Sequence, residues 1–187
     1  MPRLATGDKI KKLVLPAIDG SVFDLSAYEG KRYMLSFYRF ATCPLCNLRV
    51  HELVRRRAEL PAEFGLVAVF DASLEELTRH ATRHGADFPI LADSDNTSYR
   101  QFGVERSAWR TAAGFVRRFP QIAYGVLVKG YFPGIPGGNI TTMPLDILVN
   151  DDGTVHTAYY GRDEGDHLPM KSMFEFALGA QRPDGQV

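Results

Sequence analysis

The sequence predicts an α/β fold with a central mixed β-sheet flanked by helices, and three patterns support this prediction. Two apolar runs, 33–38 and 65–71, have the composition of strands that are covered on both faces of a sheet. Between them, residues 43–60 have the spacing of an amphipathic helix, so the three segments form a βαβ unit. Nearer the C-terminus, 145–149 and 155–160 flank a turn and predict two antiparallel strands.

The other elements fill in one domain that covers residues 1–187. Asp19-Gly20 predicts the turn of an N-terminal β extension, and Ser73 with Glu76 has the capping spacing of a helix over 73–84. A short strand at 88–92, a short helix at 97–102 and a closing helix at 169–178 complete the pattern. Residues 104–143 are left over as an insertion, helical up to about Phe119 and rich in Gly, Pro and aromatic residues after it.

Charge and composition restrict the expected partners. The 187 residues carry 22 basic and 22 acidic side chains, so no overall field is expected to attract nucleic acid or an anionic membrane. The N-terminus has no apolar secretory segment, and no run approaches the roughly 18 apolar residues that a membrane helix needs. A reducing cytoplasm is therefore the expected compartment, where a close cysteine pair is more often catalytic or metal-binding than structural.

Cys43 and Cys46 are the predicted chemical centre. Cys43 follows a buried strand and begins a helix, where unpaired N–H groups stabilise a thiolate and lower its pKa. Pro44 suits the first helical position, where its missing N–H costs nothing. Cys46 lies one turn further, on the apolar stripe with Val50 and Leu53, while Asn47 and Arg49 are expected to point elsewhere. We therefore expect Cys43 to be the exposed nucleophile and Cys46 the buried resolving thiol.

Two other interpretations of the cysteines are weighed against this one. Both could be small buried hydrophobic residues, although the helix-start position, Pro44 and the spacing all favour chemistry. A zinc site would need about four ligands, and no third cysteine exists. His80 and His84 are four residues apart on a predicted helix, but nothing in the sequence connects them to the cysteines. No metal and no cofactor are expected.

The chain resembles the thioredoxin-like superfamily, and within it the peroxiredoxin-like branch grouped with alkyl hydroperoxide reductase and thiol-specific antioxidant proteins. The matching segments are GDKI, DGSVFDLSAYEGKRYMLSFYRF, ATCPLCNLRVHEL, FPILADSDNTSYRQFGV and MPLDILVNDDGTVHTAYYG. The resemblance implies a thioredoxin-like fold, with a cis Pro144 opening the strand that faces the cysteines. Met143, Pro144, Thr42 and Pro44 would then line the substrate site.

The resemblance is incomplete at the site itself. Thioredoxins have Trp before the first cysteine, where this chain has Thr42, and a buried acid six residues before it, where this chain has Phe37. The Pro and Thr that precede the peroxide-attacking cysteine of peroxiredoxins are matched from neither cysteine. The frame is thus peroxiredoxin-like, whereas the active-site loop is thioredoxin-like.

Three functions follow from these observations. The first is thiol–disulfide exchange, in which the Cys43 thiolate attacks an oxidised protein or other disulfide and Cys46 resolves the mixed disulfide. The second is reduction of hydroperoxides, with Arg39, Arg49 and Thr42 as candidates for stabilising charge at the peroxide. The third is a binding module without catalysis. Either enzyme would need a thiol electron donor, and a homodimer is an open alternative to a monomer.

The insertion has two interpretations that the sequence weighs equally. Its apolar and aromatic residues are too numerous for plain disorder, and it leads directly to Met143. It could pack beside Cys43, as the wall of a substrate cleft or as a dimer surface. Alternatively, it could cover a distant edge of the sheet.

Overall fold

A computed structural model describes residues 3–132 and 138–179 of the protein. A five-stranded sheet forms its centre, in the order β5-β4-β3-β6-β7. These strands span Ile90–Ala92 (β5), Gly65–Phe70 (β4), Tyr33–Phe37 (β3), Leu145–Val149 (β6) and Val155–Tyr160 (β7). β3 is parallel to β4 and antiparallel to β6, so the predicted mixed sheet is confirmed.

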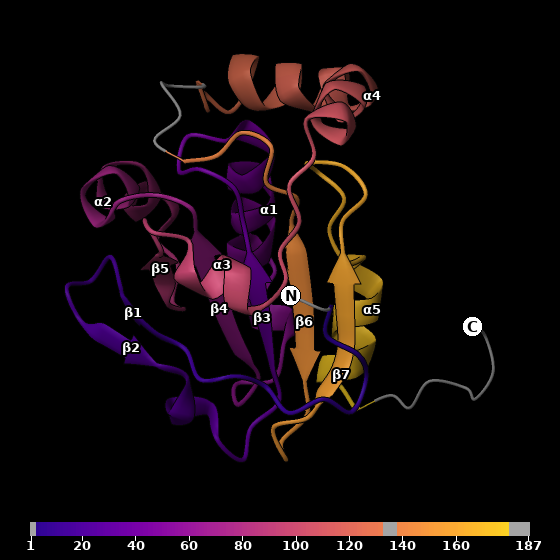
Figure 1. The fold of residues 1–187 in the computed structure, drawn as a ribbon. Helices are drawn as coiled ribbons and strands as arrows, with labels where there is room; N and C mark the ends of the chain where they lie inside the picture. Colours follow the sequence, from indigo (N-terminus) through magenta and orange to yellow (C-terminus); the bar gives the residue numbers. More distant parts are fainter. Residues whose placement is uncertain (1–2, 133–137, 180–187) are drawn as a thin grey trace.

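Helices cover both faces of this sheet (Figure 1). One face packs against α1 (Pro44–Arg55), α2 (Leu74–Ala81) and α5 (Met170–Ala177). The opposite face packs against α3 (Thr97–Gln101) and the N-terminal hairpin of β1 (Val14–Pro16) and β2 (Val22–Asp24). Short 3-10 turns follow β2, α1 and α2, at Leu25–Tyr28, Arg57–Glu59 and Thr82–His84.

The central strand β3 explains why the sequence reads as continuously apolar there. All of its residues are buried, and their side chains alternate between the two faces of the sheet. Met34 packs on the α1 side, whereas Leu35 and Phe37 pack on the α3 side. A strand covered on both faces has no reason to alternate apolar with polar residues.

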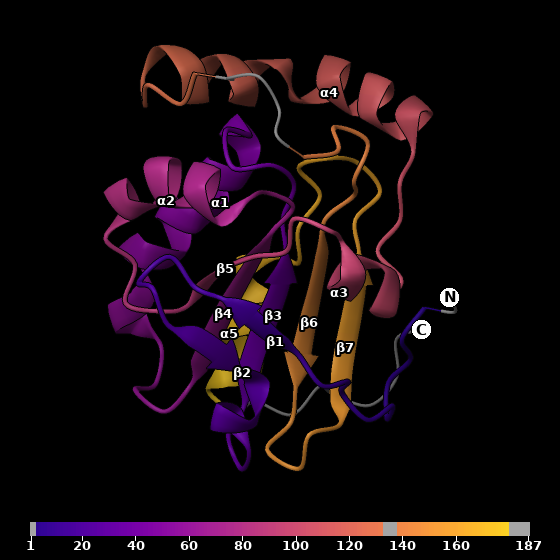
Figure 2. The same ribbon diagram turned by 60° about the vertical axis from the view of Figure 1, so that its left-hand side comes forward.

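Helix α4 (Ala108–Leu127) is the main addition to this arrangement. It lies across the top of the molecule, over the end of the sheet from which α1 starts (Figures 1 and 2). The sequence predicted a helical end near Phe119, but α4 continues through Pro120 to Leu127. Proline inside a helix removes one backbone hydrogen bond without necessarily ending the helix.

Two glycines let α4 approach the rest of the protein closely. A Cβ at Gly114 would overlap the buried carboxylate of Glu164, and one at Gly125 would lie 3.2 Å from Leu48 and 3.3 Å from Pro44. Gly125 therefore rests directly on the first turn of α1. This contact places the insertion beside the start of α1 rather than at a distant sheet edge, while its role as a cleft wall or a dimer surface stays a prediction.

None of the helices in the described residues is long and apolar enough to cross a membrane.

The close approach at Gly114 yields a stability prediction. Gly114→Ala should lower the free energy of unfolding by about 1–3 kcal/mol in urea titrations, since overpacking outweighs the better helix propensity of alanine. The exposed neighbour Ala113 offers the control: Ala113→Gly should cost no more than about 1 kcal/mol. A Gly114→Ala protein as stable as the wild type would show that α4 is not held closely at this point.

Candidate active site

The cysteine pair begins α1 as the sequence predicts. Cys43 is the N-cap residue and Pro44 takes the first helical position. Both cysteines are free thiols. The expectation that Cys43 is exposed is wrong, because Cys43 is 1% exposed and Cys46 0%. Helix α4 packs on α1 close by and places Gly125 against Pro44, the residue after Cys43.

The two thiols differ strongly in acidity. Burial alone would raise the pKa of Cys43, but a hydrogen bond from Cys46 and the charge of Arg39 outweigh it and lower that pKa to about 6. The backbone N–H groups of Leu45 and Cys46 add to this effect, as expected at a helix N-terminus. Burial and the neighbouring Cys43 sulfur raise the pKa of Cys46 well above its usual value. At neutral pH the pair therefore holds one thiolate, on Cys43, and one thiol.

Arg39 is the cation of this site. Its Nη1 lies 3.8 Å from Cys43 Sγ, its Nη2 donates to the carbonyl of Ile140, and the side chain is buried. It therefore connects the cysteine to the segment that follows α4. Arg49, the other predicted charge stabiliser, is also buried, but its Nη2 donates to Leu168 O at 2.6 Å. The structure brings Arg39 to the thiolate and directs Arg49 elsewhere.

Asn47 and His84 are functional candidates that the helical pattern missed. Asn47 was expected to point away from the core, yet it is 1% exposed. Its Nδ2 donates to Ala41 O at 2.9 Å and to Cys43 O at 2.8 Å, which fixes the loop in front of the cysteine. Its Oδ1 lies 2.6 Å from His84 Nε2, and the His84 ring packs against Tyr131 beyond α4. Helix periodicity cannot reveal such a contact, because His84 comes from the 3-10 turn Thr82–His84, a separate segment that packs on α1.

Thioredoxins have a buried acid at the position that Phe37 occupies in this chain. Here a different strand supplies a buried carboxylate, on the α1 side of the sheet. Asp146 of β6 is 0% exposed and pairs in register with Ser36 of β3. Its Oδ2 accepts from Leu168 N at 2.7 Å and lies 3.1 Å from His167 Nδ1. Burial would raise the pKa of Asp146, but the charge of His167 and its hydrogen bond lower it to about 2. An aspartate inside the apolar strand LDILV was the sequence signal for it.

The predicted cis peptide before Pro144 is wrong. No peptide bond among the described residues is cis, so Met143-Pro144 is trans. Trans is the lower-energy isomer of an X–Pro bond. The backbone N–H of Met143 donates to Glu105 O at 2.8 Å and is therefore already occupied. Both Met143 and Thr42 are buried.

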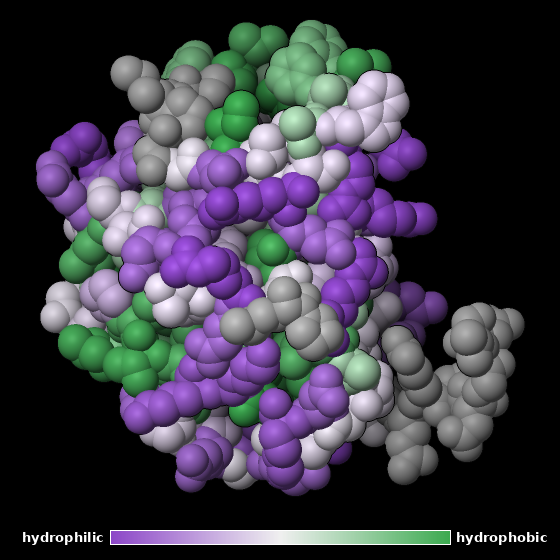
Figure 3. Space-filling model, in the orientation of Figure 1, coloured by the Kyte–Doolittle hydropathy of each residue, from purple (hydrophilic) through white to green (hydrophobic). Residues whose placement is uncertain are grey.

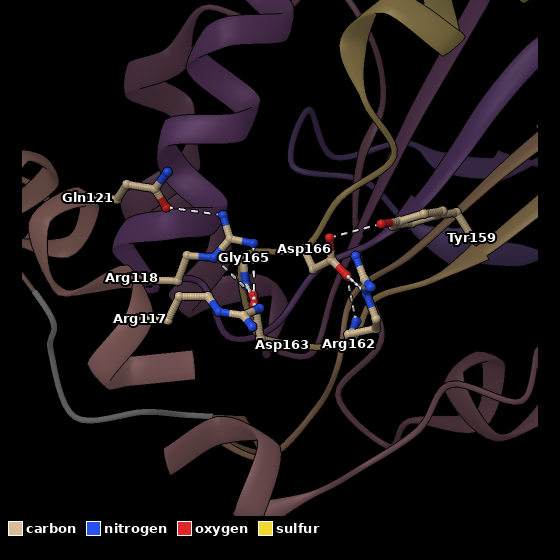
Figure 4. A network of polar contacts seen from close by, with 8 residues as sticks. All are labelled: Arg117, Arg118, Gln121, Tyr159, Arg162, Asp163, Gly165 and Asp166. Atoms are coloured by element: carbon tan, nitrogen blue, oxygen red, sulfur yellow. Dashed lines mark hydrogen bonds and ion pairs between the residues drawn. The ribbon is translucent and has the colours of Figure 1, made fainter. Parts of the chain in front are cut away.

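The loop after β7 holds α4 in place (Figure 4). Asp163 accepts from Arg118 Nε at 3.0 Å and from Arg117 Nη1 at 3.2 Å, so one buried carboxylate binds two arginines of α4. Asp166 closes the same loop by accepting from Tyr159 and Arg162. The two ion pairs of Asp163 hold α4 against this loop.

A cleft of about 670 Å³ runs beside this site, between α1, α4 and the loop at 165–169. Leu45, Leu48 and Arg49 of α1 line one wall, and Tyr124 of α4 lines the other. Neither cysteine lines it. Across residues 3–132 and 138–179, no group of histidine, cysteine and acidic side chains could hold a metal ion. In particular, His84 is engaged by Asn47 rather than paired with His80.

Fold and site together define a thiol protein of thioredoxin-like architecture, and comparison with known proteins identifies the family. The sequence model of the AhpC/TSA family matches residues 6–158, so the chain belongs to that family. Peroxiredoxin Bcp of Escherichia coli is 31% identical over 105 residues, which are 56% of this chain and 67% of Bcp. The protein is a thiol-dependent oxidoreductase of the peroxiredoxin-like branch.

Solved structures agree with the fold. Peroxidoxin BcpB of Mycobacterium tuberculosis superposes with a TM-score of 0.59 at 19% identity, covering 97% of this chain and 98% of its own. PrxQ of Xylella fastidiosa gives a TM-score of 0.63 at 14% identity, covering 97% and 100%. A thiol:disulfide interchange protein of Chlorobium tepidum gives 0.55 at 18% identity, covering 94% and 99%. These similarities confirm the thioredoxin-like fold.

The position of Arg39 predicts how the thiolate titrates. Arg39→Gln should raise the pKa of Cys43 by about one unit, because a neighbouring cation favours the charged form. Thiolate absorbance at 240 nm, followed as a function of pH, measures this shift. Arg49→Gln is the matched control and should leave the midpoint near that of the wild type. Equal shifts in both variants would contradict the assignment of Arg39 to the thiolate.

Asp146 predicts a specific acid sensitivity. Its pKa is lower in the folded protein, about 2, than the ordinary value of 3.8, so its contribution to stability is present above pH 3.8 and is lost as pH falls towards 2. Asp146→Asn should therefore destabilise the protein by about 3 kcal/mol at neutral pH and flatten the acid limb of the unfolding curve. Glu63→Gln, at an exposed acidic side chain that forms no hydrogen bond or ion pair with the described residues, should leave both the stability and the acid limb unchanged. Urea titrations across this pH range distinguish the two.

Proposed function

We propose that this protein reduces small hydroperoxides, with Cys43 as the peroxide-attacking thiolate and Cys46 as the resolving thiol. One observation carries the proposal: Cys43 is buried, and the Arg39 guanidinium lies 3.8 Å from its sulfur. A site this enclosed favours a small oxidant over the disulfide of a folded protein. The kinship with peroxiredoxin Bcp supports the same choice.

The proposed first step uses the thiolate and the cation together. The Cys43 thiolate attacks one peroxide oxygen, the O–O bond breaks, and the sulfur becomes a sulfenic acid. The other oxygen takes up a proton from solvent and leaves as an alcohol or water. Arg39 can donate to the departing oxygen, which carries negative charge as the bond breaks. The pKa of about 6 supports this role, because Cys43 is then mostly ionised at neutral pH.

The second step closes the disulfide. The Cys46 thiol attacks the Cys43 sulfenic acid, a sulfur–sulfur bond forms, and water leaves. Cys46 lies one helical turn from Cys43, which suits an intramolecular disulfide. A thiol donor, either a small thiol or a thioredoxin-type protein, must then supply two electrons to restore both thiols. A reducing compartment such as the cytoplasm is the proposed setting for this cycle.

Thiol–disulfide exchange is the second candidate. A C-P-L-C pair at a helix N-terminus, with one acidic and one weakly acidic thiol, is also the equipment of a disulfide reductase. For a protein substrate, the segments that bury the Cys43 sulfur would have to move before it could be reached. Thr42, Pro44, Met143 and Pro144 were expected to line the substrate site. A disulfide substrate would then enter along the trans Met143-Pro144 segment.

Stoichiometric oxidation tests the proposed cycle. With one equivalent of hydrogen peroxide, the wild-type monomer should lose two hydrogen atoms by mass spectrometry and form the Cys43–Cys46 disulfide. Cys46→Ser should instead gain one oxygen and react with a sulfenic-acid probe, and Cys43→Ser should do neither. A persistent disulfide-linked dimer in the wild type would contradict Cys46 as the resolving residue.

Steady-state assays separate the two candidate reactions. With dithiothreitol as the electron donor, we expect peroxide consumption to depend on Cys43 and to rise with pH through about 6, as the thiolate forms. Insulin reduction under the same conditions should be slow. Fast insulin reduction together with no peroxide consumption would favour disulfide exchange over peroxide reduction.

A further inference from the structure

The solvent side of α4 is apolar along its whole length. Trp109, Val116 and Leu127 are 80%, 76% and 81% exposed. They are spaced by seven and eleven residues, about two and three helical turns, so they lie on one line along the helix. The flanks are apolar too, and we call the whole set the apolar face of α4: Trp109, Phe115, Val116, Phe119, Tyr124, Leu127, Val128 and Phe132.

This face is a real surface of the molecule rather than the side of a loosely held helix. The opposite side of α4 carries the buried Gly114 and Gly125 and the Arg118–Asp163 ion pair, which fix its orientation. In the space-filling view, hydrophobic side chains gather over α4 at the top of the molecule (Figure 3). A contiguous exposed apolar patch of this kind on a soluble protein marks an interaction site.

Positive charge accompanies the apolar face. Residues 106–145 contain no aspartate or glutamate, although the whole chain has a net charge of zero. The same stretch carries five cations, Arg106, Arg110, Arg117, Arg118 and Lys129. Arg110 pairs with Glu105, and Arg117 and Arg118 share Asp163, so two carboxylates from outside the stretch offset part of this charge. Arg106 and Lys129 are exposed and form no ion pair with the described residues, and the Arg117 side chain is 71% exposed despite its contact with Asp163. We call these three exposed cations the basic rim of α4.

Charge decides between the partners that could cover this face. A second copy of the chain, docked by a two-fold axis, would bring the same cations against each other. An anionic lipid surface matches both the apolar side chains and the positive charge of α4. Acyl chains accept the aromatic and aliphatic side chains, while headgroups accept arginine and lysine. Trp and Tyr side chains are also favoured at the membrane interface.

We propose that α4 docks the protein onto anionic lipid surfaces through its apolar face and basic rim. The helix lies in the interface rather than across the membrane. Because α4 also covers the first turn of α1, the docked lipid lies on the same side of the molecule as Cys43. This inference goes beyond the proposed peroxide chemistry and does not depend on it.

The only tryptophan of the chain makes the test specific. Trp109 lies on the apolar face, so its fluorescence reports that face alone. With the full chain, we expect a blue shift of its emission on vesicles of phosphatidylcholine mixed with phosphatidylglycerol. Co-sedimentation with the same vesicles should weaken as salt is raised. Vesicles of pure phosphatidylcholine should give neither signal.

Two variants with equally exposed valines provide the control. Val116→Glu places a negative charge at the centre of the apolar face and should reduce the vesicle-bound fraction about tenfold, from lost burial alone. Val22→Glu makes the same change on β2, where the side chain is 72% exposed and belongs to the N-terminal hairpin. It should bind vesicles like the wild type.

Several outcomes would overturn the proposal. They are no binding to anionic vesicles, equal binding to neutral ones, or equal loss of binding in the Val22→Glu and Val116→Glu variants. Analytical ultracentrifugation without lipid covers the remaining alternative. A dimer that Val116→Glu converts to a monomer would assign the face to a second copy of the chain instead.

Discussion

The buried pair of the Arg39 guanidinium and the Cys43 thiolate is the interaction on which the rest of the site depends. A guanidinium cannot lose its proton in a protein, so burying one requires an anion or several acceptors beside it. Here the partners are the Cys43 sulfur and the carbonyl of Ile140. The same contact thus stabilises the thiolate and holds the chain segment that follows α4 over the site.

In this arrangement the Cys43 sulfur is buried, and its burial changes the chemistry that the C-P-L-C motif can perform. In an open C-x-x-C site the attacking sulfur faces solvent and can reach another protein. In this chain α4 rests on Pro44 through Gly125, and Asp163 holds the helix by two arginines. A buried thiolate next to one cation is better suited to a small polar oxidant, because charge interactions are stronger away from water.

Net charge alone does not describe the surface of α4. With equal numbers of acidic and basic residues, the sequence indicated no attraction to an anionic surface. The charges are unevenly distributed, however, and the stretch 106–145 is wholly basic. Charges separated by more than a Debye length, about 8 Å at physiological salt, act independently. A surface such as the basic rim of α4 therefore keeps its own local field, whatever the sum over the chain.

The sequence by itself determined the fold and the position of the cysteine pair, because both depend on local patterns. Apolar runs specify β3 and β4, and Pro44 between two cysteines marks the start of α1. Only the tertiary structure decided that Cys43 is buried, that Arg39 rather than Arg49 meets it, and that Asp146 supplies a buried carboxylate. Part of these results depends on contacts between distant segments, such as Arg39 with Ile140 and Arg49 with Leu168, which are 101 and 119 residues apart. Periodicity describes one element at a time, so it cannot show which face another helix will cover.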